Sequence, residues 1–205
     1  MQLKDRWTQL CQAYTADEGM VAGFWQEIVS AYTSEARAYH NQEHLVHLAE
    51  EIMEIQPYLQ DADAIWFALF YHDIVYSATA GDNEEKSARL AVERLSAMGL
   101  DHEKLQRVHS HILATKTHEA GADFDTCYLL DADLAILGAS PVAYHDYTRK
   151  VRKEYSIYPG FMYKRGRRKV LKHFLQMSRI FKTDHFYQRY EKQARENLAR
   201  ELTSL

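Results

Sequence analysis

Apolar side chains recur about every 3.6 residues along most of this chain, and few residues interrupt that period. Only three prolines and eight glycines occur among the 205 residues. A period near 3.6 places apolar residues on one side of an α-helix, whereas a half-buried strand alternates every second residue. The sequence therefore predicts an all-α fold. Its length and 46% hydrophobic content suit one domain, residues 1–205, with its own core.

Cap and turn signals divide this pattern into expected helices. Pro57 ends one of them, Gly99 is a natural stop, and Ser140 is a good first cap. Asp82 is another candidate cap, with Glu85 three residues later as in a capping box. The expected helices cover about residues 3–14, 18–33, 39–56, 61–74, 82–99, 102–115, 125–138, 140–155 and 161–181, with a final charged helix after Thr183.

The run Ile65–Phe70 is fully apolar and leads into two polar residues, His72 and Asp73. A His-Asp pair at the polar end of a buried helix has few structural reasons to occur. A neutral imidazole and a carboxylate are both ligands of divalent metals, so this pair is a candidate metal site. Histidine is also abundant, with 11 residues in 205, which favours a metal or proton-transfer site.

Two further segments complete an ordered set around this pair. His40 and His44 precede it by about thirty residues, and an Asp inside an apolar helix follows it. This order resembles the HD superfamily of metal-dependent phosphohydrolases, in particular a small bacterial branch of predicted HD phosphohydrolases. The resemblance covers residues 39–197 and implies an HD-type helical domain with a core of about residues 39–155. It rests on the motifs YHNxxH, FxxxxHDxVY, DNEExSA, an Ala-Thr pair followed by His, DADLAILG and VRxEY.

The resemblance implies a metal held between helices by His44, His72, Asp73 and Asp133. Two imidazoles and two carboxylates suit Mn²⁺, Fe²⁺, Zn²⁺, Ni²⁺ or Mg²⁺. Asp131 and Asp133 lie about 200° apart around a helix, so both cannot face one site equally. The Ala-Asp pair of the family pattern selects Asp133, with Asp131 as the alternative.

The resemblance also gives roles to three residues beside the metal. His40 matches the histidine that donates a proton to the leaving oxygen in related phosphodiesterases; the alternative is a buried histidine bonded to a backbone carbonyl. Glu84 lies where an HD fold places a carboxylate near the attacking water; the alternative is an exposed side chain beside a capping Glu85. His118 matches by position a histidine that holds a second metal in binuclear members, so one or two metals are expected.

Several cationic side chains are candidates for contact with a phosphate group. Hydrolysis of a phosphate ester needs positive charge near the non-bridging oxygens. Lys116 is one candidate. Arg149, Arg152 and Lys153 are spaced at i, i+3 and i+4, so they can share one face of a helix.

Charge is distributed unevenly along the chain. The net charge is -4, yet residues 1–148 carry 9 Lys and Arg against 24 Asp and Glu. Residues 149–172 carry 10 basic residues and one acidic residue. A concentrated basic segment in an acidic protein indicates an anionic partner or substrate. The alternative is a solvated helix face that balances acidic neighbours.

Together these features predict an enzyme that hydrolyses a phosphomonoester or phosphodiester of a small, nucleotide-like molecule. One alternative is a non-catalytic HD-type module that binds a nucleotide or another protein. Another is a helical nucleic-acid-binding protein that uses residues 149–172. The chain lacks the GxxxxGK[ST] and GxSxG motifs, which disfavours a P-loop kinase and a serine hydrolase. No apolar run approaches a membrane span and no signal peptide is recognisable, so we expect a cytoplasmic protein without a membrane partner.

Overall fold

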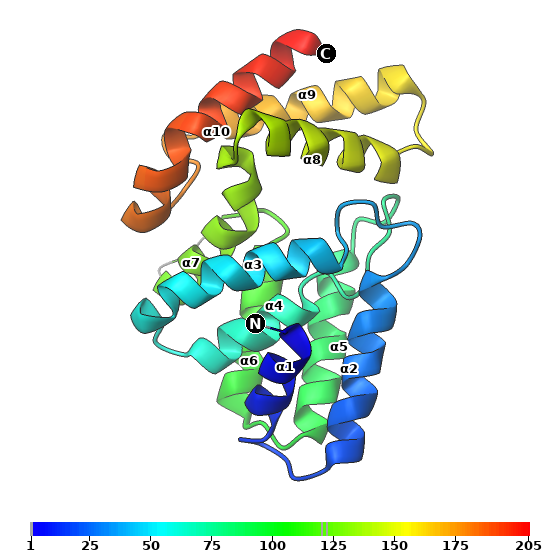
Figure 1. Ribbon diagram of the computed structural model, residues 1–205, viewed down its shortest axis with the longest axis vertical. Helices are drawn as coiled ribbons and strands as arrows, with labels where there is room; N and C mark the ends of the chain where they lie inside the picture. Colours follow the sequence, from blue (N-terminus) through cyan, green and yellow to red (C-terminus); the bar gives the residue numbers. More distant parts are fainter. Residues whose placement is uncertain (1, 120, 122) are drawn as a thin grey trace. The chain divides into compact units, whose positions relative to one another are not determined.

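The computed structural model describes residues 2–119, 121 and 123–205 (Figure 1). These residues form helices and no strand, which confirms the predicted all-α class. The elements are α1 (Leu3–Cys11), α2 (Glu18–Tyr32), α3 (Gln42–Ile55), η1 (Gln56–Tyr58), α4 (Ala62–Tyr71), α5 (Asn83–Ala97), α6 (His102–Ala114), α7 (Phe124–Leu134), η2 (Ala135–Gly138), α8 (Pro141–Glu154), α9 (Gly160–Gln176) and α10 (Asp184–Ser204).

The helices form two compact units, Met1–Leu129 and Leu130–Leu205, and the division falls inside α7. The expected single domain with a core of residues 39–155 stays a prediction.

Helix α4 is the centre of the first unit. Every side chain in the range Ala64–Tyr71 is 0% exposed. Helices α3, α5 and α6 pack against α4 (Figure 1). Trp7 of α1 contacts the rings of Phe67 and Phe70 edge-on, and Trp25 of α2 contacts Phe70 from its own helix. A helix that is apolar all round is stable only when neighbours cover every side of it, so α4 dictates the arrangement of this unit.

Most helices begin at a side chain of the expected kind. In each case the side-chain oxygen accepts a hydrogen bond from a backbone N–H of the first turn. The capping residues are Asp17, Asn41, Asp61, Asp101, Ser140 and Thr183.

Helix α5 begins differently, and the predicted capping box is wrong. Asp82 stands at the cap position but makes no side-chain cap bond. Its carboxylate binds Lys86 at 2.8 Å instead, and Glu85 pairs with Lys116. Cations within reach have therefore drawn both carboxylates away from the helix terminus.

In the second unit, the backbone of η2 packs very closely against α10. The Asn197 amide of α10 donates to the carbonyls of Leu137 and Ala139, at 2.9 Å each. Between those carbonyls lies Gly138, where a Cβ atom would be 2.5 Å from the Cβ of Tyr190. Non-bonded carbon atoms do not approach one another this closely, so only glycine permits this packing.

Helix α9 ends at Gln176, whereas the sequence predicted an end near residue 181. Two buried carboxylates capture the amides that would have continued the helix. Glu191 accepts from the backbone N–H groups of residues 180 and 181, at 3.0 and 3.1 Å. Asp131 accepts from those of residues 182 and 183, at 2.7 Å each. Charge-assisted bonds of this kind are stronger than ordinary helix bonds, so the chain turns into α10 here.

No single helix in the described part of the chain is long and apolar enough to cross a membrane. The bent pair of residues 124–138 and 141–154, with 103° between them, passes that test jointly by length and composition.

We expect Asp131→Ala to lower the free energy of unfolding by about 3 kcal/mol, because two backbone amides and the Thr183 hydroxyl lose their acceptor. Urea denaturation followed by circular dichroism measures the change. Asp184→Ala is the matched control, since that carboxylate is 82% exposed and pairs with Arg179; its loss should cost less than about 1 kcal/mol. Equal losses in the two variants would contradict this account.

Candidate metal centre

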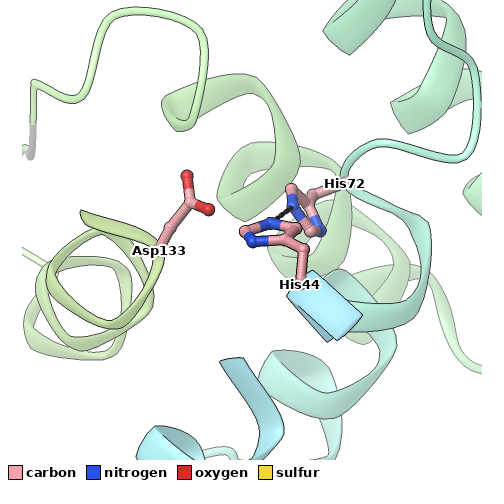
Figure 2. A group of neighbouring side chains, drawn as sticks. All are labelled: His44, His72 and Asp133. Carbon is pink, nitrogen blue, oxygen red and sulfur yellow. Dashed lines mark hydrogen bonds between the residues drawn. The ribbon is translucent and has the colours of Figure 1, made fainter. Parts of the chain in front are cut away.

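Two buried histidines of the first unit meet at their ring nitrogens. His44 lies in the first turn of α3 and is 5% exposed, and His72 follows the last residue of α4 and is 1% exposed. Their Nε2 atoms lie 3.2 Å apart (Figure 2). The sequence predicted both residues as ligands of one metal, and the structure brings their ligand atoms together.

The other ring nitrogen of His72 fixes which atom carries its hydrogen. Nδ1 lies 2.9 Å from the carbonyl oxygen of Leu69, one turn back in α4. A carbonyl only accepts, so Nδ1 is the donor, and Nε2 of the neutral ring presents a lone pair. Metal-binding histidines usually donate their second ring N–H to an acceptor of this kind, which orients the ring.

Asp73 places a carboxylate next to His72. Its Oδ2 atom lies 3.3 Å from Nε2 of His72, and its side chain is 14% exposed. The predicted pair of neighbouring ligands is therefore brought to one place, at the partly open end of α4. His44 and Asp73 thus each place a potential ligand atom next to Nε2 of His72.

Both backbone groups of Asp73 are held by side chains that sequence reasoning missed. The Tyr32 hydroxyl accepts from its N–H at 3.2 Å, and the Arg37 guanidinium donates to its carbonyl at 2.6 Å. Arg37 also donates to the carbonyls of Ile74 and His40, at 2.9 and 3.4 Å. One buried cation thus ties the His40 segment to the turn that carries His72 and Asp73.

The sequence did contain a signal for Arg37. It is the only Lys or Arg between Arg6 and Lys86. A lone cation in an otherwise acidic and apolar stretch needs a specific partner, and here its partners are backbone carbonyls. Its guanidinium also lies over the rings of Tyr32 and Tyr76, at 5.0 and 5.3 Å from their centroids, which adds cation–π attraction.

His40 lies just before α3 and adjoins the histidine pair. Its ring centroid is 5.8 Å from that of His44 and 4.6 Å from that of Tyr76, which the ring overlies at 31°. The ring is half-buried, so it combines a fixed position with access to solvent. These contacts place the predicted proton donor beside the candidate ligands of the first unit; its role stays a prediction.

The other predicted residues of the first unit lie around the α5 terminus and the end of α6. Glu84 is half-buried in the first turn of α5. Lys116 pairs with Glu85 and donates to the carbonyl of Gly81 at 2.8 Å, which ties the loop before α5 to the end of α6. His118 has a φ of 53° and closes the turn after α6 by donating its N–H to the carbonyl of residue 114. Their predicted catalytic, phosphate and second-metal roles stay predictions.

The two aspartates of α7 have different surroundings. Asp131 is 0% exposed, its carboxylate binds the backbone before α10, and burial raises its pKa. Asp133 is half-buried. Of the described side chains that could serve as metal ligands, His44 and His72 belong to the first unit (Figure 2) and Asp133 belongs to the second. Asp131 has a structural role, and Asp133 stays the predicted ligand.

The predicted phosphate-binding cations of α8 belong to the second unit, where two of them have partners. Arg149 pairs with Asp146 at 3.3 Å. Arg152 donates to the carbonyls of residues 155 and 158, at 2.7 and 3.1 Å, and lies over the ring of Tyr163. Arg152 thus holds the turn between α8 and α9, whereas Arg149 and Lys153 are exposed.

A further histidine, His111, is buried in α6 and forms a separate polar chain. Its Nδ1 lies 2.9 Å from the hydroxyl of Thr126, which donates to Asp123 at 2.8 Å. Nδ1 is therefore the donor, and Nε2 is buried without a hydrogen-bond partner among the described residues. Burial lowers the pKa of His111, although the charges of Asp123, Asp125 and Asp61 oppose the shift.

Comparison with known proteins returned no family model, no curated protein and no solved structure that matches this chain.

Replacing Arg37 by Met should lower the free energy of unfolding by about 3 kcal/mol, because three inward-facing carbonyls lose their donor. Arg37→Lys keeps the charge but not the forked arrangement of donors. Its free energy of unfolding should lie between those of the parent protein and Arg37→Met. Thermal denaturation at several urea concentrations checks the order. Arg89→Met, at an exposed position of α5, is the control and should stay within about 0.5 kcal/mol of the parent protein. An Arg37→Met protein as stable as the control would refute the anchoring role.

The lowered pKa of His111 predicts a loss of stability in mild acid. The unfolded chain takes up a proton at this histidine near pH 6.5, whereas the folded protein resists it. The contribution is therefore fully present above pH 6.5 and is lost as the pH falls toward the lower, folded pKa, by at most about 1.4 kcal/mol per pH unit. Urea unfolding at a series of pH values should show a shallower pH slope for His111→Gln than for the parent protein. Identical slopes would show that the folded pKa is not lowered.

Proposed function

We propose that this protein is a metal-dependent phosphohydrolase of the HD type, which cleaves a phosphomonoester or phosphodiester of a small, nucleotide-like molecule. One observation carries the proposal: Nε2 of His44 and Nε2 of His72 lie 3.2 Å apart, with a carboxylate oxygen of Asp73 3.3 Å from the latter. The order of these residues along the chain, which resembles the HD signature, supports the same class.

The donor set fits a divalent cation. Metal–nitrogen bonds of about 2.1 Å place two ligands of one metal about 3.0 to 3.4 Å apart, for angles between 90° and tetrahedral. The separation of the two ring nitrogens, 3.2 Å, falls in that range. The lone pair of His72 and the carboxylate of Asp73 would repel one another at 3.3 Å unless a cation or a proton lay between them. Nitrogen and oxygen ligands together suit Mn²⁺, Fe²⁺, Zn²⁺, Ni²⁺ or Mg²⁺.

A metal in this place supplies Lewis acidity, which polarises a phosphoryl oxygen and lowers the pKa of a bound water. His44 and His72 would hold it, and Asp133 would complete the set from α7. Asp73 would add a ligand and orient the attacking water. His118 would serve a second metal if one binds.

Other side chains would act on the substrate. His40 would donate a proton to the leaving oxygen, and Glu84 would accept one from the attacking water. Lys116, Arg149, Arg152 and Lys153 are the proposed contacts for the phosphate oxygens. The reaction is expected in the cytoplasm, on a small phosphorylated molecule.

Elemental analysis of the purified protein tests the site directly. We expect about one equivalent of a divalent transition metal, and less than about a tenth of that in His72→Ala, because a buried imidazole ligand is lost. His102→Ala is the matched control, since His102 is an exposed histidine of α6. Equal metal content in all three proteins would refute the ligand assignment.

The same preparations test the reaction on a panel of nucleotides. Asp73→Asn keeps the shape of the side chain but removes its charge, and it should lower the rate of phosphate release by about a thousandfold, near 4 kcal/mol of barrier. A chelator should abolish activity, and added metal should restore it. Absence of both metal and turnover after each of the five ions is added would overturn the proposal. Bound metal and a nucleotide-induced rise in melting temperature without product would support the non-catalytic binding module instead.

A further inference from the structure

Helix α9 of the second unit turns most of its surface to solvent. Of its 17 residues only Arg167 and Leu171 are buried. Arg167 explains how the inner side is fixed, because its guanidinium binds Glu201 of α10 at 2.7 and 2.9 Å and the Tyr147 hydroxyl of α8 at 3.2 Å. The rest of the helix is therefore held in place from one side and presents the other side freely.

Four cations share the outer side of this helix. Arg165, Arg168, Lys169 and Lys172 are spaced at i, i+3, i+4 and i+7, which places them in one stripe. All four are exposed. At about 1.5 Å per residue the stripe is about 10 Å long.

These four cations differ from the cations of the chain that form ion pairs. Lys86 pairs with Asp82, Arg94 with Glu27 and Arg179 with Asp184. Within the described residues, no carboxylate forms an ion pair with Arg165, Arg168, Lys169 or Lys172. The charge of the stripe is therefore not neutralised within the protein.

Large apolar side chains lie at one end of the stripe. Phe161 is 75% exposed, Met162 is 48% exposed, and Ile157 in the preceding turn is 68% exposed. A shallow groove on α9 is lined by Phe161, Met162, Arg165, Gly166 and Lys169. An exposed aromatic ring next to unpaired cations is the combination on which unpaired bases stack while cations hold the phosphates.

We propose that the outer face of α9, defined by Phe161, Arg165, Arg168, Lys169 and Lys172, binds single-stranded nucleic acid. The cations contact the phosphodiester backbone, and Phe161 stacks on a base beside the groove. Duplex nucleic acid keeps its bases paired and offers no free base to Phe161. A lipid surface fits less well, because an interfacial helix exposes an apolar face along its length. In α9 the exposed large apolar side chains are Phe161 and Met162 in the first turn and Val170 two turns further on.

The charge of the whole second unit supports this partner. Residues 130–205 carry 16 Lys and Arg against 8 Asp and Glu, whereas residues 1–129 carry 9 against 21. A cationic unit attracts a polyanion within about a Debye length and increases the association rate. The inference is independent of the proposed metal site, since none of its residues is a candidate ligand.

Fluorescence anisotropy with a labelled oligonucleotide of about 20 unpaired nucleotides tests the proposal. Neutralising all four cations to Gln should weaken binding at least about a hundredfold near 100 mM salt and reduce the slope of log K against log salt by about 3. Phe161→Ala should weaken binding about tenfold with an unchanged slope, because stacking carries no charge. The control replaces Lys4, Lys86, Arg89 and Arg107 of the first unit by Gln, with the same change in net charge, and should retain nearly all affinity.

Further variants distinguish the possible outcomes of this experiment. His72→Ala should bind the oligonucleotide as the parent protein does, so a failed metal site and a failed binding face are distinguishable. If the fourfold variant does not fold by circular dichroism, the single variants Arg165→Gln and Lys169→Gln should each reduce the slope by about 0.7. Absence of binding, equal loss in the control variant, or binding to anionic lipid vesicles without affinity for the oligonucleotide would each overturn the proposal.

Discussion

The complete burial of helix α4 is the constraint on which the first unit depends. A helix without a polar side must be enclosed by others, and the carbonyls at and after its end then need donors from side chains. His72 takes the carbonyl of Leu69, and Arg37 takes those of Asp73 and Ile74. The groups that terminate this helix therefore also orient the imidazole and the carboxylate that follow it. The candidate metal centre is a by-product of how a buried helix ends.

Local pattern predicted most of the fold. The helices begin and end within a few residues of the expected bounds, because apolar period and cap residues act over one or two turns. The failures have a common cause: Asp82 and Glu85 bind cations, and residues 180–183 bind carboxylates of other elements. The residues of the candidate site likewise fall into a predictable and an unpredictable group. His44 and His72 could be predicted from motifs, whereas Tyr32 and Arg37 act on backbone atoms 36 or more residues away, which no local pattern encodes.

The acidic residues of this chain serve several purposes, and the most buried of them bind backbone. Asp125 accepts from the amides of residues 60 and 61, Asp131 from those of 182 and 183, and Glu191 from those of 180 and 181. Each carboxylate joins separate segments of the chain, because backbone N–H groups can satisfy a buried anion. Glu191 also forms an ion pair with Arg195 at 2.6 Å. Such residues resemble ligands in a sequence, as Asp131 does beside Asp133. Burial and bonding partners separate the two kinds.

Gly138 and Gly166 show how differently one residue type can be constrained. A methyl group at position 138 would meet Tyr190 within 3 Å, whereas position 166 has nothing within 4 Å. Gly138 is therefore required for steric reasons alone. It has no side chain that could bind a ligand, yet no other residue fits at this position while α10 keeps its place. In a library of random variants, position 138 would be as intolerant as a catalytic residue. Mutational sensitivity there would report steric fit, and a search for active-site residues based on tolerance alone would be misled by it.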